Sequence, residues 1–134
     1  MALTGRCQCG GVAYEIAGAP LEIYVCHCRE CRRQSASAFG ISVIARVADV
    51  TVTRGTPQRW SRPTDRGGTL ECSFCAECGT RLFHAAPGEA TISVKGGSLD
   101  APPDLTGVAH IWTAHKLAGV TIPPDSPTYP GEPD

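Results

Sequence analysis

The stretch Cys75-Ala76-Glu77-Cys78-Gly79 has the spacing of a metal-binding knuckle, in which two residues form a tight turn between two thiols. Gly79 suits this turn, because glycine readily adopts the positive φ that such turns often need. A second pair of thiols, Cys7-Gln8-Cys9, lies near the start of the chain and precedes Gly10-Gly11. The two pairs supply four thiolates, a complete tetrahedral shell. We therefore expect one closed metal site that ties residue 7 to residue 78 and serves folding.

A further group of thiols, Cys26-His27-Cys28-Arg29-Glu30-Cys31, places three sulfurs within six residues. Three ligands leave one position of a tetrahedral ion free, and an exchangeable position is what zinc catalysis requires. The alternative is a second closed site, completed by Cys72 or by a histidine. Cys72 equally suits a buried core position, which is common for free cysteine. His27 would point away from the neighbouring sulfurs on an extended chain, and the remaining histidines are isolated and suit surface or hydrogen-bonded roles: His84, His110 and His115.

The eight cysteines favour metal binding over a disulfide framework. Thiols two residues apart on a strand form a disulfide only with strain, and no apolar run near the start of the chain indicates export. We therefore expect a cytoplasmic protein whose thiols stay reduced, and no stretch approaches the length that spans a membrane. Zinc suits sulfur-rich tetrahedral sites without redox chemistry, and an iron–sulfur cluster is the competing interpretation.

Charge is unevenly distributed along the 134 residues, although the formal net charge is only −1. Residues 29–66 contain eight arginines and three acidic residues, so the rest of the chain is acidic. Scattered arginines are usually just solvated. Three of them crowd the three-cysteine motif, where guanidinium groups would suit a ligand that carries carboxylates: Arg29, Arg32 and Arg33.

The hydrophobic pattern predicts a mainly β domain of sandwich-like or tent-like architecture with long loops. The expected strands are Gly11–Ile16, Leu21–Val25, Phe39–Val47, Val50–Thr53, Thr69–Phe74, Arg81–Ala85, Thr91–Lys95 and Ala109–Thr113. Only Cys28–Ser37 looks helical, and Ser61–Gly68 reads as an exposed loop. We expect a single zinc domain over residues 1–122. Residues 123–134 are rich in proline and predict an extended or loose tail.

Four stretches of this chain, in order, closely resemble the glutathione-dependent formaldehyde-activating family, which includes the domain of centromere protein V. They are Gly5-Arg6-Cys7-Gln8-Cys9-Gly10-Gly11-Val12-Ala13-Tyr14, Cys26-His27-Cys28-Arg29-Glu30-Cys31-Arg32-Arg33, Ser37-Ala38-Phe39 and Phe74-Cys75-Ala76-Glu77-Cys78-Gly79-Thr80. The resemblance extends from about residue 5 to about residue 113. It is specific, because three cysteine motifs coincide in order.

The resemblance implies a β-tent fold with two zinc ions. One is a structural zinc held by Cys7, Cys9, Cys75 and Cys78, and the other is a catalytic zinc held by Cys26, Cys28 and Cys31. In the family's namesake activity the second zinc serves carbon–sulfur bond chemistry, joining the thiol of glutathione to formaldehyde to give S-hydroxymethylglutathione. Relatives often carry a tryptophan a few residues beyond the position of Trp112. Here Leu117-Ala118-Gly119-Val120 lies in that region, so we expect a different substrate wall.

Together with the cysteine motifs, the resemblance implies a carbon–sulfur lyase or synthase that acts on glutathione or a related thiol and an aldehyde or other electrophile. Arg29, Arg32 and Arg33 would orient carboxylates. Ser35 or Ser37 would steady an oxygen or cap a helix, and His27 is the candidate general base. The competing hypothesis is a non-enzymatic zinc module that contacts protein or nucleic acid through its arginines. The acidic remainder of the chain argues against a nucleic-acid partner.

Overall fold

The computed structural model describes residues 2–133, which form two β-sheets and one short α-helix. The smaller sheet has the strand order β1 (Ala2–Arg6), β2 (Ala13–Ala17), β5 (Val50–Arg54). The larger sheet has the order β10 (Ala109–Ile111), β3 (Glu22–Cys26), β4 (Gly40–Arg46), β9 (Thr91–Lys95), β8 (Arg81–Ala85), β7 (Thr69–Phe74), β6 (Gln58–Pro63). All pairings are antiparallel except that of β10 with β3. The prediction of a mainly β domain is confirmed.

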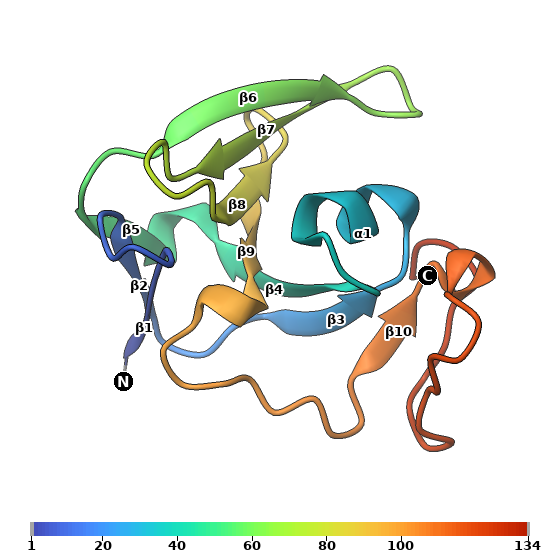
Figure 1. The fold of residues 1–134 in the computed structure, drawn as a ribbon. Coiled ribbons are helices and arrows are strands. Elements are labelled where there is room, and N and C mark those ends of the chain that lie inside the picture. The colour runs from blue at the N-terminus through green and yellow to red at the C-terminus, as the bar shows by residue number, and fades with distance from the viewer. Residues whose placement is uncertain (1, 134) are drawn as a thin grey trace.

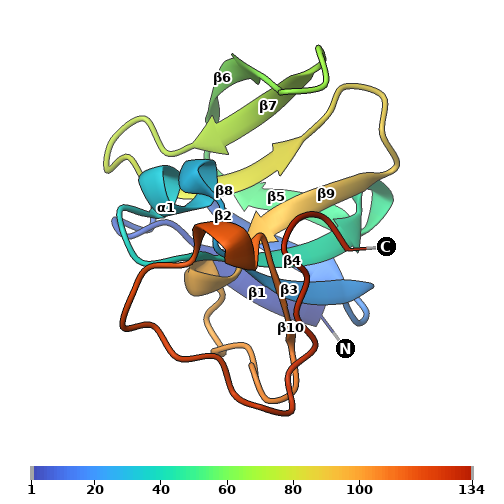
Figure 2. The ribbon, with the colours of Figure 1, turned by 90° about the vertical axis from the view of Figure 1, so that its right-hand side faces the viewer.

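The helix α1 (Arg29–Ser35) follows β3 directly and lies within the curve of the large sheet (Figure 1), whose β6–β7 hairpin arches beyond it. The view in Figure 2 shows α1 close to β8 and the C-terminal segment beside β10. Three single 3₁₀ turns complete the fold: η1 (Val47–Asp49), η2 (Gly96–Ser98) and η3 (Thr113–His115). None of the helices among the described residues is long and apolar enough to cross a membrane.

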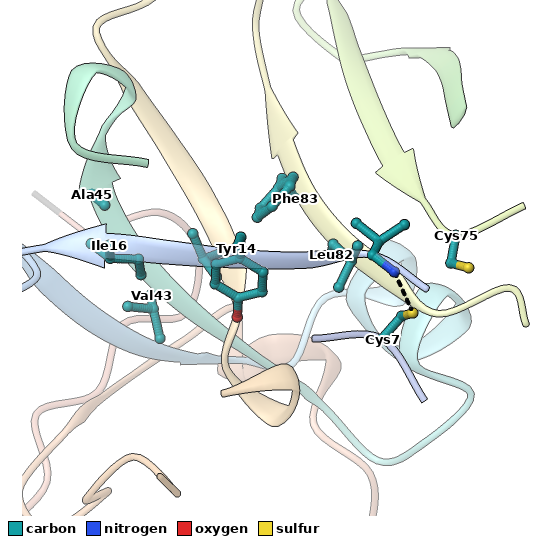
Figure 3. Packing of buried hydrophobic residues seen from close by; sticks show 10 residues of the cluster. Cys7, Tyr14, Ile16, Val43, Ala45, Cys75, Leu82 and Phe83 are labelled. Atoms are coloured by element: carbon teal, nitrogen blue, oxygen red, sulfur yellow. Dashed lines mark hydrogen bonds between the residues drawn. The ribbon is translucent and has the colours of Figure 1, made fainter. Parts of the chain in front are cut away.

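The main hydrophobic core fills the space between the two sheets. Tyr14 and Ile16 of β2 meet Val43 of β4 and Phe83 of β8 (Figure 3). The rings of Tyr14 and Phe83 meet edge to face, with 5.0 Å between their centroids. Cys7 and Cys75 belong to the same buried cluster, so a metal site here would lie directly against the core.

The opposite face of the large sheet carries several polar side chains, and the strand register shows which residues lie on it. Val43 pairs with Val94, which pairs with Phe83, and these side chains point into the core. The alternate pairs, Ser42–Lys95, Ser93–His84, His84–Cys72 and Cys72–Trp60, therefore point the other way. We call this second surface the site face, because the cysteines of α1 lie beside it.

The observed elements differ from the prediction at several boundaries. The helix is shorter than Cys28–Ser37, because Cys28 is its N-cap and Ala36 ends it in the left-handed region with φ 52°. The strand expected to reach Thr113 ends at Ile111, since Trp112 has a φ of 56°. The Ser61–Gly68 loop prediction is wrong for residues 61–63, which belong to β6. That strand is an exposed edge with little apolar patterning, and β1 was likewise not anticipated.

The proline-rich C-terminal segment is extended and held against β10 rather than loose. The backbone N–H of His110 donates to the carbonyl of Pro127 at 2.8 Å, and that of Tyr129 donates to the carbonyl of His110 at 2.9 Å. Trp112 donates from its backbone to Gly131 at 3.0 Å and from its indole to the Glu132 carboxylate at 3.0 Å. The segment thereby covers one side of β10 and supports Trp112.

Candidate metal centres and adjoining cavities

Four thiols from distant parts of the chain converge beside the core. The ligand atoms of Cys7, Cys9, Cys75 and Cys78 all lie within 4.8 Å of one another. The sulfur of Cys9 is 3.6 Å from that of Cys7 and 3.7 Å from that of Cys75. Tetrahedral zinc with Zn–S bonds of ~2.3 Å would hold its sulfurs about 3.8 Å apart, so the donor set fits such an ion. All eight cysteines are free thiols.

Backbone amides surround this four-cysteine cluster and favour its ionised form. The N–H of Val12 donates to the sulfur of Cys7 at 3.2 Å, and that of Gly11 donates to Cys9 at 3.4 Å. Hydrogen bonds from the side chain and backbone of Thr80 lower the pKa of Cys78 to about 5. Gly79 has the positive φ, 81°, expected at the end of the knuckle. The cluster therefore combines the right donors with a backbone arranged around thiolates.

A second cluster forms where β3 passes into α1. Cys26 ends β3, Cys28 is the N-cap of the helix, and Cys31 lies in its first turn. The backbone N–H of Cys31 donates to the sulfur of Cys28 at 3.2 Å. The three sulfurs lie within 4.8 Å of one another, so this three-cysteine cluster could also hold a metal ion.

Thiolate character in the three-cysteine cluster concentrates on Cys28. Hydrogen bonding from Cys26 and then from Cys31 lowers the pKa of Cys28 strongly, helped by backbone donors at the start of α1. The same interaction raises the pKa of Cys26, which keeps its proton longest. Three sulfurs so close share a small number of negative charges, and a bound cation would relieve their mutual repulsion.

No fourth ligand completes the three-cysteine cluster among residues 2–133, judged by His, Cys, Asp and Glu ligand atoms within 4.8 Å of all three sulfurs. Cys72 belongs to neither cluster. Its side chain is 0% exposed, and its sulfur lies 3.9 Å from the carbonyl oxygen of Leu70. In this structure Cys72 is therefore a buried residue of the site face. Of the two roles that the sequence left open, a metal ligand or a buried residue, its position matches the buried residue.

Two adjacent cavities, which share lining residues, lie beside the three-cysteine cluster between α1 and the β6 edge. The Cys31 cavity has a volume of about 260 Å³, and the Cys28 cavity has a volume of about 620 Å³. Trp60 and Arg62 of β6 line both, together with Glu30 and Arg33 of α1. The indole of Trp112 forms part of the wall beside Cys28 and stacks on His115 with 5.8 Å between the ring centroids.

The three arginines proposed from sequence do not share one position. Arg29 and Arg33 line the Cys28 cavity, and Arg33 also lines the Cys31 cavity. Arg32 lines only a separate hollow on the outer side of α1, which Arg29 and Arg33 also reach. Ser35 caps the helix end, since its hydroxyl lies 2.8 Å from the Cys31 carbonyl and 3.1 Å from the Phe39 carbonyl.

His27 lies away from the cluster, inside the protein. Its side chain is 0% exposed, and its Nε2 atom lies 2.9 Å from Nδ1 of His110. Burial lowers the pKa of both imidazoles. His27 lines none of the cavities described here, so the structure gives no support to its role as a general base.

Sequence reasoning missed a group of basic residues on the site face. The ammonium of Lys95, a residue only 7% exposed, lies 2.8 Å from Nδ1 of His84. Burial lowers the pKa of Lys95 to about 8 and that of His84 to about 3. Arg81 lies over the Trp60 ring, 5.8 Å from its centroid. Strand alternation hinted that residues of β8 and β9 such as His84 and Lys95 share a face. Arg81 has the same parity as the core residue Phe83, and its partner Phe74 lies at a register shift, so alternation could not place it beside the cysteines.

The fold and the two cysteine clusters define a mainly β protein with two potential metal centres. A sequence model described as "Glutathione-dependent formaldehyde-activating enzyme" matches residues 2–115, and the chain belongs to this family. The structure is also similar to the crystal structure of a Rhodobacter sphaeroides protein, with a TM-score of 0.61 and 26% sequence identity. That similarity covers 80% of this chain and 98% of the other.

Proposed function

We propose that this protein is a cytoplasmic, zinc-dependent carbon–sulfur lyase or synthase that acts on glutathione or a related thiol adduct. The observation that carries the proposal is the three-cysteine cluster, which has no fourth ligand among residues 2–133 and opens onto two cavities. Family membership supports the same reading. The four-cysteine cluster, packed against the core, would hold a second, structural zinc.

A zinc ion on Cys26, Cys28 and Cys31 would supply a soft Lewis acid that favours the thiolate form of an incoming thiol. The cavities above the cluster would admit the thiol and the aldehyde together. Their reaction forms one sulfur–carbon bond, and the proton of the thiol is accounted for on the carbonyl oxygen, which becomes a hydroxyl. The reverse reaction breaks the same bond and releases thiol and aldehyde.

The basic side chains around the cavities would orient a substrate that carries carboxylates. Arg29 lies beside Cys28 and has no carboxylate within 4.0 Å among residues 2–133. Arg33 lines both cavities, where a substrate carboxylate would compete with that of Glu30, 3.3 Å away. Arg32 would act from the outer side of α1, through the hollow that it shares with these two residues. Arginine suits carboxylate binding because its planar guanidinium donates two parallel hydrogen bonds.

A matched pair of cysteine variants tests the proposal. Magnetisation-exchange NMR would follow the interconversion of glutathione and formaldehyde with S-hydroxymethylglutathione, and mass spectrometry would count the zinc ions per chain. We expect Cys28→Ala to lose one zinc and to fall to the uncatalysed rate, because it removes a ligand of the open site. Cys72→Ala should keep both zinc ions and the rate. Equal rates and equal zinc content in the two variants would contradict the proposed function.

The competing interpretation, a nucleic-acid or protein module, finds less support in the charges. Four of the eight arginines in residues 29–66 lie within 4.0 Å of a carboxylate: Arg33, Arg46, Arg59 and Arg62. Paired arginines offer less free charge to a phosphate backbone. Salt-sensitive retention on DNA, together with no response to glutathione, would favour this interpretation over the enzyme.

A further inference from the structure

A third cavity, which the proposed reaction does not use, lies between the end of α1, the knuckle of the four-cysteine cluster and η2. Its volume is about 700 Å³, within the range of small-molecule sites. Three basic side chains line it, Arg6, Arg81 and Lys95, and no Asp or Glu does so among the described residues. The Cys78 thiol of the knuckle, with a pKa of about 5, also lines it, so three positive groups face one negative group. Uncharged polar groups make up much of the remaining wall: Gln8, Gln34, Ser35, Ser37, Thr80 and Ser98. We call it the cationic cavity.

The two inner cations of this cavity lack a carboxylate partner. Within residues 2–133 no carboxylate oxygen lies within 4.0 Å of Arg81 or Lys95. Nε of Arg81 is buried without a hydrogen-bond partner. Lys95 is nine-tenths buried, and within residues 2–133 the one hydrogen bond of its Nζ is to the neutral acceptor His84. Electrostatic interaction with the nearby Cys31 and Cys26 sulfurs offsets part of the lowering that burial imposes on the pKa of Lys95. Buried charges are normally paired, so this wall favours an anion.

The cationic cavity adjoins the three-cysteine cluster. Gln34 and Arg81 line both the cationic cavity and the Cys31 cavity. Gly40 lines the cavity beside Cys31, where a Cβ atom would lie 3.6 Å from the Cys31 sulfur and 3.2 Å from the Gln34 amide nitrogen. Because glycine has no side chain to fill this space, a ligand in the cationic cavity lies close to the proposed site of reaction.

We propose that the cationic cavity binds a carboxylate end of the thiol substrate, with Arg81 and Lys95 as the groups that recognise it and Arg6 at the edge. The proposal rests on the proposed function, because it assumes that the three-cysteine cluster receives the thiol. A glutathione-like tripeptide carries a carboxylate at each end. One end would lie beside Arg33 and Arg29, and the other would enter the cationic cavity. Arg81 and Lys95 would then be specificity-determining residues that favour a substrate with a carboxylate at this end over small neutral thiols.

Calorimetry with S-methylglutathione on the zinc-loaded protein tests this assignment without a free thiol. We expect wild type to bind it, and to bind its diethyl ester at least about tenfold more weakly, because the ester lacks the carboxylate charges. Arg81→Gln should weaken binding of the acid by about tenfold or more, and Lys95→Met should do the same. Arg59→Gln is the matched control, since Arg59 lies on the neighbouring hairpin, exposed and paired with Glu71 at 3.7 Å.

Three results would overturn the assignment: no binding of S-methylglutathione to wild type, equal binding of acid and ester, or unchanged affinity in both Arg81→Gln and Lys95→Met. Each can occur while the exchange of S-hydroxymethylglutathione is still catalysed, in which case the proposed function stands. Conversely, selective binding that depends on Arg81, without any catalysed exchange, would leave the assignment intact and contradict the proposed reaction.

Discussion

His84 and Lys95 form an unusual pair at the centre of the site face, since one partner is a buried ammonium and the other an imidazole. An ammonium can only donate hydrogen bonds, so Nδ1 of His84 accepts at 2.8 Å and the imidazole proton resides on Nε2. Burial, followed by the charges of Lys95, Arg62 and Arg81, lowers the pKa of His84 to about 3. The imidazole is therefore neutral throughout the physiological range.

This depressed pKa predicts a specific loss of stability in acid. The folded state keeps His84 neutral, whereas the unfolded chain protonates it below its ordinary pKa of 6.5. The stability that His84 contributes is therefore complete above pH 6.5 and is lost as the pH falls toward 3, at up to about 1.4 kcal/mol per pH unit. We expect the free energy of unfolding to fall less steeply between pH 7 and pH 5 in His84→Gln than in wild type.

Nitrogen-detected NMR of the imidazole provides the direct check on this prediction. The expected spectrum shows the Nε2–H tautomer without titration from pH 8 to pH 5. A His84 titration midpoint near 6.5, or parallel stability curves for wild type and His84→Gln, would show that the imidazole is solvated and that the Lys95 contact is absent.

At the scale of single residues, the sequence predicted which cysteines come together but not which residues surround them. Cys7 and Cys78 could be assigned to one cluster from spacing, because pairs of thiols two or three residues apart are typical of metal ligands. Lys95 and Arg81 carried no comparable pattern, since each is one basic residue within a strand. Their importance arises from strand order, which brings β8 and β9 beside α1 and which local patterns do not encode.

Among the elements, the C-terminal segment is one whose contacts the sequence pattern did not predict. Residues 126–132 lack apolar periodicity, yet they make backbone hydrogen bonds to His110, Trp112 and Thr113. β6 poses the same problem, because its exposed and mostly polar residues read as a loop although they pair with β7 along six positions. Both elements depend on partners distant in sequence, whereas β4 and β9 show the apolar residues that predict a strand.

Removal of the chain after Ile122 should therefore destabilise the protein. The truncated form loses five backbone hydrogen bonds between the segment and the β10 region, donated by His110, Trp112, Thr113, Ala114 and Tyr129. At roughly 1 kcal/mol each, the expected loss is about 3–5 kcal/mol, seen as a drop of several degrees in Tm. The zinc of the four-cysteine cluster should remain, because none of its ligands contacts this segment. An unchanged Tm would show that the segment is not held against β10.

At the scale of the whole molecule, the two cysteine clusters differ in what surrounds them. The four-cysteine cluster joins the start of the chain to the β7–β8 turn against the main core, and its shell is complete. The three-cysteine cluster lies on the opposite, polar side of the large sheet, where α1 occupies the curve seen in Figure 1. The large sheet thus has a four-thiol cluster packed against the core on one side and a three-thiol cluster beside open cavities on the other.

The open coordination position at Cys26, Cys28 and Cys31 is the central claim, and cadmium-113 NMR tests it most directly. Cadmium replaces zinc at thiolate sites, and its chemical shift reports the number of sulfur ligands at each site separately. We predict one resonance typical of four sulfurs and a second typical of three. Addition of glutathione should move only the second, toward the four-sulfur position. Two four-sulfur resonances before any thiol is added, or a second resonance that ignores glutathione, would contradict the account.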